Sequence, residues 1–133
     1  MFEYALSVMI FLPILAGLTL FLFPLSGGAS RITGFIVSIA VLFLGVELFL
    51  GFSGTGAMEY AESRAWIESL GIRYSLGVDG ISLLVLMAGT ILFPMVFTVF
   101  STRPKGFYAN LLITQGAMIG AICATDMVLF YIF

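Results

Sequence analysis

The chain has 133 residues, of which 62% are hydrophobic and only 9% are charged. A soluble domain carries about 25% charged residues, so this composition excludes a water-soluble monomer. The net charge of −2 leaves no basic surface for a nucleic acid. With no histidine and a single cysteine, Cys123, the chain cannot build a zinc site, an iron–sulfur cluster or an intrachain disulfide. These limits predict an integral membrane protein.

Four apolar segments are long enough to cross a bilayer as helices, which takes about 20 residues. They run from about residue 4 to 24, 32 to 52, 81 to 100 and 107 to 124, and each is bounded by glycine, proline or charge. A fifth helix is predicted to start at 126 and to continue to 133. The sequence therefore predicts an all-α, polytopic membrane protein in which residues 1–133 form a single membrane domain.

The last predicted helix is too short to cross a membrane. Seven residues from Met127 to Phe133 extend only about 10 Å as a helix. A chain end at that depth would expose backbone carbonyls to lipid. We therefore expect these residues to be the first part of a longer polytopic protein.

The basic residues predict which side of the membrane each loop occupies. Arg31 lies between the first two spans, and Arg103 and Lys105 lie between the third and fourth. Basic residues prefer the cytoplasmic side, whereas the loop of residues 53–78 is net acidic. We therefore expect the N-terminus and the 53–78 loop outside, with the chain in a bacterial inner (plasma) membrane.

The 53–78 loop has two predicted elements of its own. Glu62–Leu70 is predicted as a short interfacial helix, with Trp66 and Leu70 one turn apart and Gly71 ending it. Ile72–Val78 alternates apolar and polar residues, which predicts a short strand. Because an unpaired strand edge is unfavourable, we expect its partner in another loop or in a neighbouring subunit.

Three acidic residues are candidates for a functional site because charge near a membrane interior is costly. Glu47 is either a member of a proton relay or a side chain that reaches the outer interface or a neighbouring helix. Asp79 and Asp126 are either caps of helix amino ends or residues at the outer mouth of a hydrated path. No nucleophile–base set, phosphate-binding loop or metal cluster is present, so no catalytic, cofactor-binding or metal-binding residue is predicted.

Small residues and prolines inside the spans predict how the helices pack. Gly116, Gly120 and Ala124 recur every fourth residue, which gives the fourth span one smooth face for close helix packing. Pro13 and Pro94 remove backbone hydrogen bonds within the first and third spans and predict kinks there.

Two segments resemble a known family. Residues 74–83, YSLGVDGISL, and residues 124–133, ATDMVLFYIF, resemble the antiporter-like membrane subunits of respiratory complex I, of the chain M or subunit 4 type of NADH–quinone oxidoreductase. The resemblance implies a fold of about fourteen helices with inverted repeats. It also implies proton translocation driven by quinone reduction elsewhere in the complex. Other membrane subunits would be partners, and NADH, FMN, iron–sulfur clusters and quinone would bind to partner subunits, with no cofactor on this chain.

The proton-pathway residues of that family match no position in this chain. The family's glutamate lies further along the fifth helix, and its lysines lie on later helices. Two alternatives to a proton-pumping subunit stay open from the sequence. One is a subunit of a multi-subunit cation/proton antiporter or of a membrane-bound hydrogenase, and the other is a structural or assembly subunit without an ion path.

Overall fold

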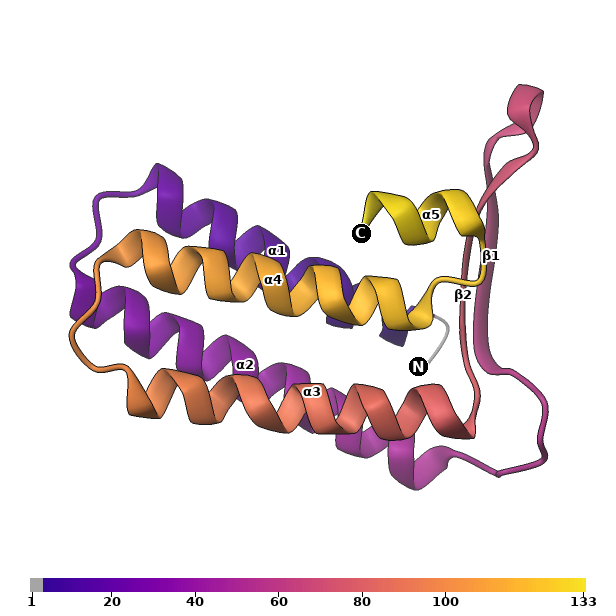
Figure 1. Ribbon diagram of the computed structural model, residues 1–133, viewed down its shortest axis with the longest axis horizontal. Coiled ribbons are helices and arrows are strands. Elements are labelled where there is room, and N and C mark those ends of the chain that lie inside the picture. The colour runs from indigo at the N-terminus through magenta and orange to yellow at the C-terminus, as the bar shows by residue number, and fades with distance from the viewer. Residues whose placement is uncertain (1–3) are drawn as a thin grey trace.

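The computed structural model describes residues 4–133 as a helical bundle with a β-hairpin across one end. The helices are α1 (Ala5–Leu22), α2 (Gly27–Gly51), α3 (Gly80–Val99), α4 (Lys105–Cys123) and α5 (Met127–Ile132), and the hairpin consists of β1 (Glu59–Ile67), the short 3-10 helix η1 (Glu68–Leu70) and β2 (Ile72–Val78). Figure 1 shows α1 to α4 side by side, with the hairpin standing across their ends. We call this the hairpin end of the bundle, and the end that carries residues 23–26 and 100–104 the distal end.

The helices α1 to α4 are long and apolar enough to cross a membrane. The predicted fold class, a polytopic helical membrane protein, is therefore confirmed. The second helix begins at Gly27 rather than near Ile32, because the Ser26 hydroxyl accepts a hydrogen bond from the Ala29 amide at 3.2 Å and caps the helix. Apolar composition marks the lipid-crossing part of a helix, whereas its capping residue marks where the helix begins.

The prediction of an interfacial helix over Glu62–Leu70 is wrong. Most of this segment belongs to β1, which pairs antiparallel with β2, and only Glu68–Leu70 forms a single 3-10 turn. Gly71 follows that turn in the left-handed conformation (φ 68°) and closes the hairpin. Local helical spacing is overridden because the predicted strand Ile72–Val78 finds its hydrogen-bonding partner here. Its main partner therefore lies in the same loop, and Leu76 forms one further isolated bridge with Ala124 in the α4–α5 connection.

Glycines bring α1 and α4 into close contact, as the small-residue pattern predicts. A Cβ atom on Gly116 would lie 2.5 Å from the carbonyl oxygen of Ile10, and one on Gly17 would lie 2.7 Å from the carbonyl oxygen of Ala109. Gly120 faces a different element, since its Cβ would meet the ring of Phe133 at 2.5 Å. The smooth face of α4 thus packs on both α1 and the end of α5.

Buried apolar side chains form one cluster toward the hairpin end and another toward the distal end. Leu6, Met9 and Leu86 belong to the first, and Phe97 and Tyr108, stacked at 5.9 Å, belong to the second. Many large apolar side chains on the outside of the bundle are exposed, as is expected of helices that face lipid. The core therefore runs the length of the bundle and fixes both ends.

Candidate functional site

At the hairpin end, a carboxylate from the hairpin caps the first helix. Glu62 is only 7% exposed, and its Oε1 accepts hydrogen bonds from the amides of Leu6 (2.9 Å) and Ser7 (3.2 Å). Its Oε2 accepts a hydrogen bond from the Ser7 hydroxyl, which also lies 2.8 Å from the hydroxyl of Tyr74. The carboxylate thus satisfies free donors of the α1 amino end and meets its positive dipole.

Asp79 and Asp126 cap the other two helices that begin at this end. The carboxylate of Asp79 accepts a hydrogen bond from the Ser82 amide at 2.7 Å, and this bond holds the pKa of Asp79 below its ordinary value. The carboxylate of Asp126 accepts hydrogen bonds from Val128 (2.9 Å) and Leu129 (3.3 Å). The predicted capping of both helices is confirmed.

The hairpin is joined to the bundle at two further points. The Tyr60 hydroxyl donates to the carbonyl of Leu48 near the end of α2, at 3.1 Å, and Tyr60 itself has a positive φ of 55°. The Thr125 amide donates to the Ser75 carbonyl at 3.0 Å, so the α4–α5 connection runs beside β2. Burial raises the pKa of Tyr74, which keeps its hydroxyl protonated beside Ser7. The hairpin is therefore a fixed part of the structure.

Basic side chains occupy helix carboxyl ends at the distal end. Arg31 donates from Nε to the Phe97 carbonyl at 2.7 Å and from a terminal nitrogen to the Thr98 carbonyl at 2.9 Å. Lys105 donates from Nζ to the Phe23 carbonyl at 3.2 Å. Because carbonyls at a helix carboxyl end lack partners within the helix, these cations stabilise the ends of α3 and α1.

The middle of the bundle holds a buried polar pair. The Ser38 hydroxyl of α2 donates to Oε1 of Gln115 on α4 at 2.8 Å, and neither side chain is exposed to solvent. Within the part of the chain that the structure describes, Nε2 of Gln115 has no acceptor. This amide is thus a buried polar group at the contact between α2 and α4.

The three predicted candidates do not form one site. Among residues 4–133, no hydrogen bond or ion pair joins Glu47, Asp79 and Asp126. Glu47 is partly buried near the carboxyl end of α2. Each aspartate contacts the first turn of the helix that follows it. The two aspartates therefore stabilise helix amino ends, and the three candidates do not lie together as one group.

The sequence argument missed Glu62 and the Ser38–Gln115 pair. Glu62 carried no signal because its role depends on the hairpin, which was predicted as a helix. Ser38 and Gln115 are visible in the sequence as polar residues at the middle of two spans. Their contact follows only from the packing of α2 against α4.

Comparison with known proteins adds what the geometry does not reveal. No protein-family model matches the chain. The chain is 40% identical to the F(420)H(2) dehydrogenase subunit M of Methanosarcina mazei over 75% of its length, and 33% identical to the NADH-quinone oxidoreductase subunit M of Rhodobacter capsulatus over 96%. It is 30% identical to the NADH-ubiquinone oxidoreductase chain 4 of Arabidopsis thaliana over 98%.

The chain is a homologue of these subunit M and chain 4 proteins. The resemblance noted at residues 74–83 and 124–133 is thereby confirmed, and the similarity extends over most of the chain. Together with the four apolar helices, the homology places the chain in a membrane. The chain spans 21%, 26% and 28% of the length of these three relatives. Its length is therefore about a quarter of that of these subunit M and chain 4 relatives.

Proposed function

We propose that the chain is the N-terminal part of an antiporter-like subunit that translocates protons in a quinone-reducing dehydrogenase complex. The observation that carries the proposal is the similarity, over 96% of the chain, to the NADH-quinone oxidoreductase subunit M of Rhodobacter capsulatus. Other membrane subunits of the same complex would be its partners. NADH or another reduced cofactor, FMN, iron–sulfur clusters and quinone would bind to those partners.

The names of the relatives support a role remote from the electron donor. The chain is similar both to a subunit of an F(420)H(2) dehydrogenase and to subunits of NADH dehydrogenases. Because similar subunits occur in complexes that oxidise different electron donors, we expect them to serve a step that these complexes share. Ion movement coupled to the oxidation of the donor is such a step.

The structure supports a scaffolding role for these residues within the subunit. Among residues 4–133, Glu62, Arg31 and Asp79 bind at helix ends, and the buried polar side chains in the middle of the bundle, Ser38, Thr90 and Gln115, are neutral. A carboxylate–lysine pair suits proton transfer because burial and mutual attraction shift both pKa values in opposing ways. We propose that such a pair lies in the later helices of the subunit, held in place by this bundle.

The proposed orientation puts the hairpin end outside a bacterial inner membrane and the distal end in the cytoplasm, because Arg31, Arg103 and Lys105 gather at the distal end. Two exposed threonines in loops at opposite ends allow a matched test. We expect an impermeant thiol reagent to label Thr55→Cys in intact cells and Thr102→Cys only after permeabilisation. The reverse pattern would overturn the orientation.

The function is tested on the complex that contains the full-length subunit. An affinity tag on the subunit should recover a complex that reduces quinone, and inverted membrane vesicles should acidify when the electron donor is added. Recovery with partners that lack redox cofactors, or quinone reduction without acidification in sealed vesicles, would contradict the proposal.

A further inference from the structure

A buried amide in the middle of the bundle has a hydrogen-bond donor to spare. Gln115 of α4 is fully buried, and only its Oε1 is paired, with the Ser38 hydroxyl at 2.8 Å. Among residues 4–133, its Nε2 has no acceptor. Lys105 and Cys123, the ends of α4, lie ten and eight residues away, so the amide is about 12 Å or more from either end of the helix. A buried donor without an acceptor is unfavourable, so this group needs a further partner.

The third helix presents two free acceptors in its middle. Pro94 has no amide hydrogen, so the carbonyl of Thr90, four residues earlier, lacks its helical donor. The Thr90 side chain is fully buried, and its hydroxyl donates to the Met87 carbonyl at 3.0 Å. The hydroxyl oxygen can still accept a hydrogen bond. Thr90 therefore offers acceptors where Gln115 offers a donor.

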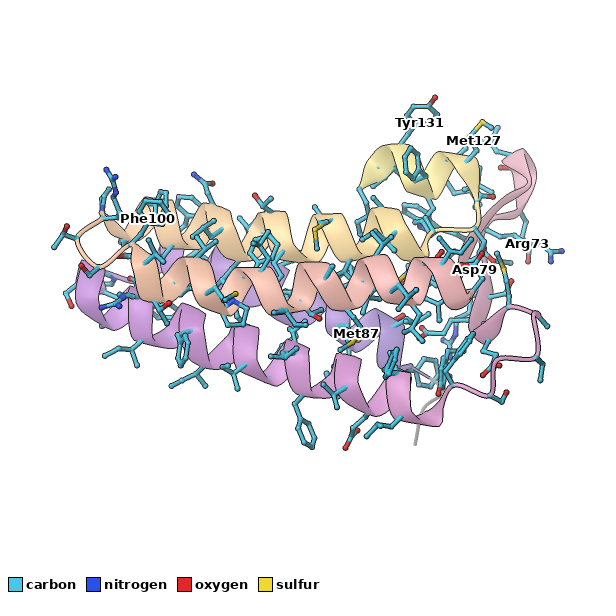
Figure 2. The ribbon with its side chains drawn as sticks, turned by 60° about the horizontal axis from the view of Figure 1, so that its bottom comes forward. Arg73, Asp79, Met87, Phe100, Met127 and Tyr131 are labelled. Carbon is cyan, nitrogen blue, oxygen red and sulfur yellow. The ribbon has the colours of Figure 1, made fainter. Side chains whose placement is uncertain are left out.

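Contacts between α3 and α4 place Thr90 and Gln115 at one depth. The two helices run antiparallel, and Figure 2 shows α3 beside α4, with Asp79 and Phe100 marking the ends of α3. Two contacts bracket the level of Gln115: Gly89 faces the side chain of Met118, and Phe97 stacks on Tyr108. Three residues back from Met118 is Gln115, and three residues on from Gly89 is position 92. Gln115 therefore lies level with the turn between Thr90 and Pro94.

Contacts of α2 place Ser38 at the same depth. A Cβ atom on Gly45 would lie 3.4 Å from the Thr90 hydroxyl oxygen, and Gly34 faces the ring of Phe97. Ser38 lies between these two glycines and bonds to Gln115. Three helices thus bring neutral polar groups to one level in the middle of the bundle.

The chemistry of these groups favours water as the ligand. A metal cation could bind the Thr90 oxygens but would be repelled by the amide hydrogens, and an anion would meet the opposite conflict. Water accepts from the amide and donates to the oxygens. Ser38, Thr90 and Gln115 are each 0% exposed within the described helices alone, so neither a lipid nor a later segment of the subunit reaches them from outside.

We propose that an ordered water molecule binds in the middle of the bundle, where it accepts a hydrogen bond from Nε2 of Gln115 and donates one to the carbonyl of Thr90. Its second hydrogen is available to the Thr90 hydroxyl. The water links α4 to α3 at the turn where Pro94 interrupts the hydrogen bonds of α3. The site goes beyond the proposed function, and it does not depend on proton translocation.

The proposal is tested by electron cryomicroscopy of the complex that contains the full-length subunit, at a resolution that shows ordered water. We expect a peak about 2.7–3.2 Å from both Nε2 of Gln115 and the carbonyl oxygen of Thr90. A direct bond from Nε2 to a protein oxygen, or no peak between the two groups, would overturn the proposal. So would a peak about 2.4 Å from several oxygens, which is the distance of a metal ion.

Substitutions test each hydrogen bond of the water. Gln115→Met keeps the length of the side chain but removes the donor, and it should lower the occupancy of the peak about ten-fold. Pro94→Ala supplies an amide hydrogen to the Thr90 carbonyl and should also lower the occupancy. Ser38→Ala is the control, because it removes a polar group from Gln115 but leaves Nε2 and the Thr90 carbonyl in place; the peak should stay.

An unchanged peak in Gln115→Met or in Pro94→Ala, with the complex intact, would contradict the proposed bonding. The map of the unmodified complex decides the proposal where a variant does not assemble.

Discussion

Replacing Glu62 by alanine is expected to loosen the hairpin from the first helix. The substitution removes the acceptor for the amides of Leu6 and Ser7 and for the Ser7 hydroxyl. A helix cap contributes about 1 kcal/mol, and a carboxylate beside a helix amino end adds about 0.3–1 kcal/mol. The Ser7 hydroxyl keeps a partner in Tyr74, 2.8 Å away. We therefore expect a loss of about 2 kcal/mol, which raises the open population of the first turn about thirty-fold.

Hydrogen exchange of the assembled complex measures that population directly, because the affected donors are backbone amides. Exchange in a peptide that covers residues 4–8 should be about thirty-fold faster in Glu62→Ala. Glu62→Gln keeps an oxygen acceptor but loses the charge, so its increase should be about five-fold. Glu68→Ala removes an exposed acid from the hairpin tip and serves as the control. Unchanged exchange in Glu62→Ala, with the complex intact, would refute the capping role.

Three further substitutions test the packing and the helix ends. Gly116→Ala should lower the amount of assembled subunit at least several-fold, because the new Cβ would lie 2.5 Å from a backbone oxygen of α1. The control is Gly28→Ala, whose new Cβ meets nothing within 4 Å and should leave that amount unchanged. Immunoblots of membranes compare the amounts of the two variants. Arg31→Gln should speed amide exchange over residues 95–100 about ten-fold, whereas Arg31→Lys should have a smaller effect. Asp79→Ala should speed exchange at the start of α3, whereas Asp79→Asn should not, because asparagine also caps. The pKa of Asp79 is lowered in the folded chain, so its contribution is complete above its ordinary pKa of 3.8 and is lost only as pH falls through the lower folded-state value. Protection at the start of α3 should therefore be equal at about pH 5 and about pH 8.

The spans and two of the caps could be predicted because each depends on residues close together in the chain. An apolar run of membrane length has one stable conformation in lipid, since the helix satisfies all of its backbone hydrogen bonds internally. Asp79 and Asp126 directly precede the helices that they cap. The capped amides lie two or three residues further on, so the sequence contains both partners of the interaction.

The hairpin could not be predicted because its stabilising interactions are distant in the sequence. The one-turn spacing of Trp66 and Leu70 predicts a helix over Glu62–Leu70, whereas the competing strand depends on pairing with β2 across the turn at Gly71. Docking of the hairpin depends on the bonds of Glu62 to Leu6 and Ser7 of α1, which lie 56 and 55 residues away in the sequence. Local propensity is too weak to outweigh the hydrogen bonds of strand pairing.

The position of each charge follows from the direction of the helix beside it. The amino ends of α1, α3 and α5 lie at the hairpin end, and each meets a carboxylate: Glu62, Asp79 and Asp126. The carboxyl ends of α1 and α3 lie at the distal end, and each meets a cation, Lys105 or Arg31. Both contacts complement the helix dipoles.

This pairing of charge with helix direction links membrane orientation to stability. Exchanging the acids and bases between the two ends, to reverse the orientation, would also place cations at helix amino ends and carboxylates at carboxyl ends. Two of the three basic side chains that favour the cytoplasm in the proposed orientation, Arg31 and Lys105, therefore also complete helix ends. The carboxyl end of α2, which runs the other way, meets the neutral hydroxyl of Tyr60 instead of a cation. In the proposed orientation, Arg31 and Lys105 thus serve both purposes at once, because each lies on the cytoplasmic side and binds carbonyls at the carboxyl end of a helix.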